Sequence, residues 1–473
     1  MSEQRSFSGF ILIEKFAENF DLPLDQMKFV ISQAIALILS LVFKFAFDHR
    51  KVSNTTRHLA SFLPGVTLGL FCFGFKVMHL FTMAIVCYLS MLAFKANYVH
   101  KLVFAIAMLY VCYLHLLRLI DDYGAYRIDI TTPAMIMVQK VTSLSFALRD
   151  EQTEERLKNE QQKSRLQNTL SLLTYFCYLF HFQTFFCGPF IRYQDYMEFV
   201  EGKNFTKYYK REKGLNQEPS IVVPVIKKLA TSVLFAAATL AFGKKFPISK
   251  LADANYLKRL SLFSLVKYLL ASTTVARFKY YHAWKLSEAV CIASGLGFNG
   301  FTDYGEPKWD LASHVDIIRF ETSLNAKAAT ASWNKTTQHW LRSIVYERVQ
   351  RYRVLSTYLV AAIWHGFYPG YYISFLSGAL FVKAARIVRR FVRSHFQKRK
   401  ELAALYDAIT FVTMRLITFY IWFPFEMLEF YSSLKIYFRL FCFGHLLSLL
   451  ALIILPKIFN HSSINVKLAE KIV

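Results

Sequence analysis

Charged side chains are scarce in this sequence, and acidic ones are the scarcest. Only 19% of the 473 residues are Asp, Glu, Lys or Arg, whereas about a quarter is usual for a soluble domain. Lys and Arg number 57 against 32 Asp and Glu, which gives a formal charge of +25. Hydrophobic residues make up 55% of the chain, so we expect no nucleic-acid partner despite this basic balance. The composition is typical of an integral membrane protein that lies against an anionic leaflet.

Cysteine motifs and a signal peptide are also missing. The seven cysteines form no CxxC pair, and no cluster of His, Cys and acidic residues has metal-ligand spacing. We therefore expect no metal and no cofactor. Residues 1–26 are short of apolar length and carry acids, so we expect no cleaved signal peptide and a first membrane span near 29–47.

Long apolar runs recur along the whole chain. Backbone polar groups cannot stay unpaired in lipid, so such runs must be helices. Several runs are shorter than a full crossing or contain Gly, Pro or charge, which indicates tilted or re-entrant helices around an internal cavity. The predicted fold class is all-α, a polytopic membrane protein with about 9 to 12 transmembrane or re-entrant helices. The expected runs are 29–47, 59–75, 77–94, 99–120, 170–186, 221–242, 260–281, 286–298, 355–367, 371–387, 405–430 and 434–454.

No internal repeat and no Gly/Ser-rich linker divides the chain. We therefore expect a single membrane domain over residues 1–473. Two charged stretches, 149–167 and 383–402, lie between the apolar runs. The second is strongly basic and is predicted to face the cytosol, and the first is expected to be a solvated cytosolic helix.

The most unusual segment is 295–353, where apolar runs give way to polar sequence with Gly and Pro turns. From Ser332 onward, Trp333, Trp340 and Leu341 recur at helical spacing among polar residues. This pattern favours a helix that lies in the membrane interface plane.

His365 stands alone as an ionisable residue inside the apolar run that follows. An imidazole at membrane depth is a functional candidate, because its burial needs a reason. A neutral ring accepts a proton at physiological pH, which attack by a hydroxyl group requires. The alternative role is structural, a hydrogen bond from His365 to a backbone carbonyl that holds two helices together. Asn334 has an alternative role as well, because it heads a glycosylation sequon, as do Asn54, Asn204 and Asn460.

These residues resemble the membrane-bound O-acyltransferase family. The resemblance is carried by SWN at 332–334 and by IWHGFYPGYYISFL at 363–376, with His365 following Asn334 by 31 residues. Supporting segments are 129–146, 186–199 and 278–301, so the matches cover most of a core at 129–380. The segments 314–316 (HVD), 319–322 (RFET) and WHGFYPGYY look closest to the lysophospholipid branch, and more narrowly to the lysophosphatidylinositol acyltransferases.

The resemblance implies helices around a tunnel, which acyl-CoA enters as co-substrate while a lysophospholipid arrives from the bilayer. His365 would deprotonate the free sn-2 hydroxyl, and Asn334 would orient that hydroxyl or donate a hydrogen bond to the developing oxyanion. It also implies phospholipid remodelling in the endoplasmic reticulum membrane. The substrate-binding residues expected from the resemblance are Trp333, Trp364, Gly366, Gly370, Tyr371, Gly188, Pro189, Arg192 and Tyr193.

Three other functions stay open at this point. The first is acyl transfer to a lysophospholipid with a choline, ethanolamine or serine headgroup, and the second is acyl transfer to a protein hydroxyl. Both stay open because the sequence does not reveal the acceptor. The third is a proton-coupled transporter, but such a protein should place several ionisable groups along its midplane helices. Here the polar residues gather near Asn334 and His365 instead. The oligomeric state and the acyl-chain preference are not indicated.

Overall fold

The computed structural model describes residues 8–20, 22–94, 96–124, 127–152, 170–209 and 218–469. Within these ranges the regular structure is helical, apart from an isolated β-bridge between Phe301 and Pro307. This confirms the predicted all-α fold class. The charged stretch expected at 149–167 lies mostly outside the described residues.

Contacts divide the chain into two units. Unit 1 comprises residues 1–234 and 282–314, and unit 2 comprises 235–281 and 315–473. The single domain expected over 1–473 stays a prediction. The helices that begin in unit 1 are α1 (Ser8–Asn19), α2 (Leu24–Ala46), α3 (Asn54–Phe73), η1 (Gly74–Val77), α4 (Met78–Ala93), α5 (Ala96–Asp121), α6 (Thr131–Gln152), α7 (Leu172–Phe180), α8 (Tyr193–Val200), α9 (Lys203–Tyr209) and α10 (Val222–Phe242).

Among the helices that begin in unit 2, those between residues 317 and 346 are short, and the longer ones follow toward the carboxyl end. One of them, α12, extends into unit 1 from His282 onward. They are η4 (Ile248–Ala252), α11 (Ala254–Arg259), α12 (Leu262–Ser294), α13 (Ile317–Glu321), α14 (Ala326–Ser332), α15 (Lys335–Leu341), the π-helical turn η5 (Arg342–Tyr346), α16 (Arg353–His365), α17 (Pro369–Phe391), α18 (Arg393–Phe396), α19 (Lys400–Met427), α20 (Phe430–Arg439) and α21 (Phe443–Ala469).

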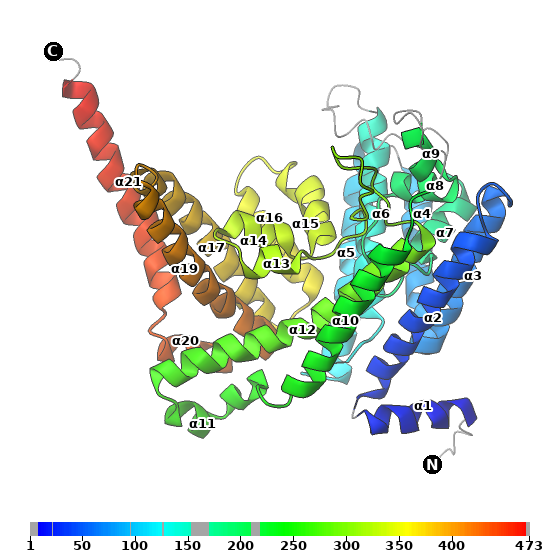
Figure 1. Ribbon diagram of the computed structural model, residues 1–473, viewed down its shortest axis with the longest axis horizontal. Coiled ribbons are helices and arrows are strands. Elements are labelled where there is room, and N and C mark those ends of the chain that lie inside the picture. The colour runs from blue at the N-terminus through cyan, green and yellow to red at the C-terminus, as the bar shows by residue number, and fades with distance from the viewer. Residues whose placement is uncertain are drawn as a thin grey trace. The chain divides into compact units, whose positions relative to one another are not determined.

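Unit 1 is a bundle with polar side chains in its interior. Helices α2 and α3 lie side by side, and α5 packs against both α4 and α6 (Figure 1). Lys140 of α6 is fully buried, and its Nζ donates to the carbonyl oxygens of Tyr178 at 3.0 Å and Leu179 at 3.1 Å. These carbonyls end α7, where the last turn of a helix lacks internal partners and carries partial negative charge. Lys140 therefore joins α6 to the end of α7.

Unit 2 is organised around α17, which packs against α16, α19 and α21 (Figure 1). Pro369 occupies the first turn of α17, where its missing N–H costs nothing. Gly370 permits close contact with α19, because a Cβ atom there would lie 2.1 Å from the carbonyl oxygen of Pro424. Its N–H donates to the carbonyl oxygen of Leu428 at 2.9 Å. Gly370 is therefore a packing position at the start of α17.

Six helical stretches in the described part of the chain are long and apolar enough to cross a membrane, or seven if one bent pair counts as a span. Some expected runs form shorter helices: α7 has nine residues and α16 has 13. At ~1.5 Å per residue both fall short of the ~30 Å hydrocarbon core. The chain is a multi-pass membrane protein. The six stretches are Leu24–Ala46, Asn54–Ala93, Tyr98–Asp121, Val222–Phe242, Pro369–Phe391 and Lys400–Met427, and the bent pair is Phe430–Arg439 with Phe443–Phe459.

Candidate active site

Asn334 lies at the break between α14 and α15 in unit 2. Its backbone adopts φ 42° and ψ 54°, the left-handed region that Asn enters more readily than most residues. This residue interrupts the helix expected from Ser332 onward, so that α15 begins only at Lys335. The Asn334 side chain makes no capping hydrogen bond to α15. Its carboxamide therefore does not cap the start of α15.

His365 is the last residue of α16. Its Nδ1 lies 2.7 Å from the carbonyl oxygen of Ala361 in the same helix, so Nδ1 carries the hydrogen and Nε2 is the basic nitrogen. Gly366 ends the helix at φ 118°, a conformation that suits glycine. The carboxyl end of a helix favours positive charge, which the ring gains when it accepts a proton. This arrangement suits a general base.

Aromatic rings surround the imidazole of His365. The ring centroids of Trp364, Phe375, Phe425 and Tyr371 lie 4.7, 4.8, 5.4 and 5.8 Å from it. The rings contact the imidazole edge-on or at a tilt rather than in parallel stacks. The imidazole itself is partly buried, and apolar neighbours of this kind strengthen its electrostatic interactions with reacting groups.

A chain of rings joins His365 to Trp333, the neighbour of Asn334. Trp333 lies 4.6 Å from Trp422, Trp422 lies 5.8 Å from Phe425, and Phe425 lies 5.4 Å from His365, all between ring centroids. Because each ring packs against the next, a shift of Trp333 would be transmitted to the surroundings of His365. Unit 2 thus connects both catalytic candidates through one packed cluster.

Trp364 and Tyr371 were expected to bind substrate, and the structure places both beside His365. Trp364 is 3% exposed and packs against the fully buried Trp340 of α15 at 5.7 Å. Trp364 therefore joins α15 to α16 in addition to contacting the imidazole. Gly370, also expected to bind substrate, supports the contact between α17 and α19, and its role in substrate binding stays a prediction.

An ion-pair network that no sequence pattern indicated packs against Trp333. The carboxylate of Glu321 accepts hydrogen bonds from Arg277 at 2.8 and 3.0 Å, from Arg415 at 2.9 Å and from the Tyr281 hydroxyl at 2.6 Å. The ring of Tyr281 lies 5.8 Å from Trp333. Burial would raise the pKa of Glu321, but the two guanidinium groups outweigh it and hold that pKa below its usual range. The carboxylate is therefore charged and links three helices, α12, α13 and α19.

Two expected substrate-binding residues, Arg192 and Tyr193, lie in unit 1 at the start of α8. The Arg192 guanidinium donates to both carboxylate oxygens of Asp195, at 2.8 and 2.9 Å. The hydroxyl of Tyr193 donates to Oγ1 of Thr174 at 2.9 Å, and the residue is buried. These contacts anchor the first turn of α8, and the expected role of both residues in substrate binding stays a prediction.

Gly188 and Pro189, the other two expected residues of this segment, are buried. The hydroxyl of Ser287 in α12 donates to the carbonyl oxygen of Gly188. A Cβ atom on Gly188 would lie 3.1 Å from Cε1 of His314, at φ 84°, where glycine is favoured. The segment therefore packs tightly against α12 and His314.

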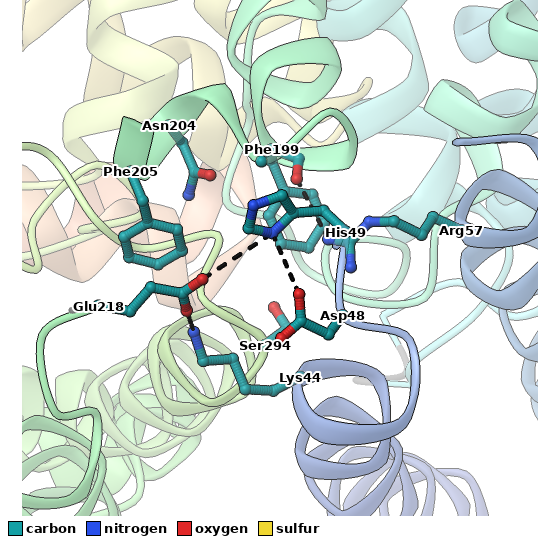
Figure 2. A pocket seen from close by; sticks show the side chains of 10 residues that line it. Lys44, Asp48, His49, Arg57, Phe199, Asn204, Phe205, Glu218 and Ser294 are labelled. Atoms are coloured by element: carbon teal, nitrogen blue, oxygen red, sulfur yellow. Dashed lines mark hydrogen bonds and ion pairs between the residues drawn. The ribbon is translucent and has the colours of Figure 1, made fainter. Parts of the chain in front are cut away.

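A small cavity of about 10 Å³, little more than the room for one water molecule, lies in unit 1 among charged side chains (Figure 2). Lys44 pairs with Glu218, and Nδ1 of His49 lies 3.5 Å from Asp48 and 3.8 Å from Glu218. Burial lowers the pKa of His49, although both carboxylates oppose this effect. None of the expected site residues lines the cavity, and its charges are engaged with one another. We interpret these charge pairs as a structural cross-link between the loop after α2 and Glu218.

No three His, Cys, Asp or Glu side chains in the described ranges are placed to hold a metal ion. The expectation that the activity needs no metal or cofactor stays a prediction.

Residues 75–423 match the membrane-bound O-acyltransferase family. The chain belongs to this family. The matched range contains Asn334 and His365 as well as the segment around Gly188.

Individual relatives of this membrane-bound O-acyltransferase carry similar names. Lysophospholipid acyltransferase 6 of Drosophila melanogaster is 39% identical over 96% of the chain, which covers 64% of that protein's length. Membrane-bound glycerophospholipid O-acyltransferase 1 of Mus musculus is 34% identical over 95% of the chain and 93% of its own length. A lysophospholipid acyltransferase of Schizosaccharomyces pombe is 32% identical over 76% of the chain and 71% of its own length. Acyl transfer to a lysophospholipid is the activity that the family and these names support.

Proposed function

We propose that this membrane-bound O-acyltransferase transfers a fatty acyl group from acyl-CoA to the free sn-2 hydroxyl of a lysophospholipid, in remodelling at the endoplasmic reticulum membrane. The observation that carries the proposal is the state of His365, which donates through Nδ1 to Ala361 and lies within an aromatic shell. That state leaves Nε2 as the nitrogen that takes a proton.

In the proposed reaction, Nε2 of His365 removes the proton from the acceptor hydroxyl as its oxygen attacks the thioester carbonyl. A tetrahedral intermediate forms, and the carbon–sulfur bond then breaks. The imidazolium returns its proton to the departing thiolate, so the products are the new ester and CoA with a free thiol. Each proton and electron pair is accounted for without a covalent acyl-enzyme.

Asn334 is proposed to donate a hydrogen bond from its carboxamide to the oxyanion of that intermediate. A single donor of this kind contributes about 3 to 4 kcal/mol of barrier lowering in other acyl-transfer enzymes. The left-handed backbone of Asn334 and the packing of Trp333 support a fixed carboxamide position. Pre-organised donors of this type cost no rearrangement during the reaction.

For the headgroup we propose inositol. This finer proposal rests on the resemblance of the segments 314–316, 319–322 and WHGFYPGYY to the lysophosphatidylinositol branch. Inositol is a neutral polyol, so no charged partner for the inositol ring is required of the site. Choline, ethanolamine and serine headgroups are the alternatives, and direct comparison of acceptors decides among them.

The test supplies microsomes that contain the chain with labelled acyl-CoA and lysophospholipids carrying each of the four headgroups. We expect transfer to be fastest with lysophosphatidylinositol and to be lost in His365→Ala and Asn334→Ala. His395→Ala and Asn255→Ala are matched controls, because both side chains are exposed outside the site. Unchanged turnover in His365→Ala at equal expression would end the proposal. Faster transfer to another headgroup would overturn inositol alone.

A further inference from the structure

The last turns of α17 in unit 2 carry a basic face that takes no part in the proposed reaction. A helix advances by about 100° per residue, so positions 383, 386, 389 and 390 fall within a sector of about 120°. The buried residues Phe381 and Ala384 lie on the opposite side of the helix. We name the exposed side chains of this sector the α17 basic face; they are Lys383, Arg386, Arg389 and Arg390.

No acidic side chain balances these charges. The sequence contains no Asp or Glu between Glu347 and Glu401, and none of the four cations forms an ion pair with a described residue. Like charges three or four residues apart on one helix repel each other, and Arg386 has such neighbours at Lys383, 389 and 390. The α17 basic face therefore favours a negative charge supplied from outside the chain.

The position of this face follows from the span that carries it. Helix α17 is long and apolar enough to cross a membrane, and its 23 residues at ~1.5 Å each slightly exceed the ~30 Å hydrocarbon core. The hydroxyl of Ser374 donates to the carbonyl oxygen of Ile421 at 2.7 Å, so the end of α17 lies beside the start of α19 (Figure 1). Long basic side chains near the end of a span extend to the lipid headgroups.

Aromatic contacts hold the backbone of this region in place. Phe391, the last residue of α17, stacks on Phe459 of α21 with ring centroids 5.3 Å apart and planes 10° apart. Phe396 of α18 lies 5.5 Å from Tyr406 of α19. These contacts tie α17 and α18 to the two neighbouring helices. Cations on a fixed backbone lose less freedom on binding than cations on a flexible tail.

We propose that the α17 basic face binds the headgroups of anionic phospholipids in the surrounding bilayer. The guanidinium group matches the geometry of phosphate oxygens, and each cation at an anionic membrane surface adds to the attraction. A membrane helix presents this face, which favours lipid over a protein or nucleic-acid partner. The proposal does not depend on the acceptor of acyl transfer. CoA carries phosphates as well, so the test must separate lipid from CoA.

The test titrates the purified full chain in neutral detergent with short-chain phosphatidylglycerol, which carries one negative charge, with short-chain phosphatidylcholine, which has no net charge, and with CoA. Native mass spectrometry measures the three dissociation constants. Lys383→Gln/Arg390→Gln removes two exposed charges from the face. We expect about thirtyfold weaker binding of phosphatidylglycerol, since each cation contributes about fivefold, and unchanged binding of phosphatidylcholine and CoA. Salt at about 1 M should weaken phosphatidylglycerol binding to the wild type, because it screens exposed charges.

Lys258→Gln/Arg259→Gln is the matched control, because it also removes one exposed lysine and one exposed arginine, on α11, whose first turn is capped by Asp253. This control should bind phosphatidylglycerol like the wild type. Lys383→Arg/Arg390→Lys keeps both charges and should also bind normally. Wild-type affinity in Lys383→Gln/Arg390→Gln, or an equal loss in the control, would overturn the site. Weakened binding of CoA with unchanged binding of phosphatidylglycerol would overturn the assignment to lipid.

Discussion

Nδ1 of His365 lies 2.7 Å from the carbonyl oxygen of Ala361, one helical turn earlier in α16. The bond fixes the ring by its own helix rather than by a neighbouring one. Because the bonded carbonyl belongs to the same helix, this contact does not hold two helices together. It instead sets which nitrogen carries the hydrogen, and Gly366 ends the helix directly afterwards. These features match those required of a general base more closely than those of a structural histidine.

His365→Gln should therefore lower acyl transfer by about two to four orders of magnitude without unfolding the protein. Glutamine retains hydrogen bonding and much of the ring's volume, but it cannot accept a proton at neutral pH. The rate of labelled acyl transfer at saturating substrates measures the effect, and the melting temperature in detergent checks the fold. A variant with a normal melting temperature and wild-type rate would remove His365 from the mechanism.

Substitution of Asn334 can separate its backbone role from its carboxamide role. Asn334→Gly accepts φ 42° without strain, so it should fold like the wild type while kcat falls about a hundredfold or more. Asn334→Ala loses the same carboxamide and also places a Cβ atom in the left-handed region, which costs about 1 kcal/mol more. Single-turnover kinetics and thermal unfolding of both variants measure the two contributions. A wild-type kcat in Asn334→Gly would show that the carboxamide of Asn334 does not contribute to catalysis and that only its backbone conformation is needed.

The catalytic candidates were predictable from sequence because each lies in a short local pattern. His365 is isolated in an apolar run, and both residues lie in segments that resemble one family. The break before α15 was not predictable, because the helical spacing of Trp333 and Trp340 continues straight through it. Only the backbone shows that Asn334 leaves the right-handed region.

Pairings between distant residues were also beyond the sequence. Glu321 meets Arg277 and Arg415, which lie 44 and 94 positions away, and no local pattern announces such a pairing. The expected run 170–186 forms a helix only up to Phe180, because apolar content does not separate helix from buried turn. The sequon at Asn204 is likewise buried, and its Nδ2 donates to Gly295, which the sequon pattern alone did not reveal.

Glu321→Gln tests whether the ion-pair network positions the active site. The uncharged amide cannot balance Arg277 and Arg415, so Trp333 should lose its fixed packing. We expect kcat to fall severalfold to tenfold with an unchanged KM for acyl-CoA, and the melting temperature to fall by a few degrees. Glu321→Asp should restore part of kcat, whereas a purely structural role would change the melting temperature and leave kcat intact.

The control for this experiment is Glu347→Gln. Glu347 pairs with Arg342 at 2.7 Å, but their side chains are 46% and 68% exposed. Exposed ion pairs contribute little to stability, so kcat and melting temperature should both match the wild type. A loss in Glu347→Gln equal to that in Glu321→Gln would show that any lost carboxylate has the same effect.

Gly370→Ala should damage the fold rather than substrate binding. The added methyl would lie 2.1 Å from the carbonyl oxygen of Pro424, and backbone atoms cannot move aside without separating α17 from α19. We expect a melting temperature several degrees lower and reduced yield of folded protein. The KM values of the remaining folded fraction should equal those of the wild type. A selective rise in the KM for either substrate at normal stability would instead place Gly370 in the binding site.

The stability of the protein should depend on pH through His314. Burial lowers the pKa of His314 to about 4, and the nearby Glu288 only partly opposes this. The unfolded chain takes up a proton near pH 6.5, whereas the folded chain does so near pH 4, so stability present above pH 6.5 is lost as the pH falls through this window. The loss approaches about 3 kcal/mol, and it should appear as a falling melting temperature between pH 7 and pH 4.5.

His314→Gln cannot titrate, so its melting temperature should fall less over the same range. The exposed-site control His395→Gln should follow the wild type. Parallel curves for wild type and His314→Gln would mean that His314 is not buried as a neutral ring.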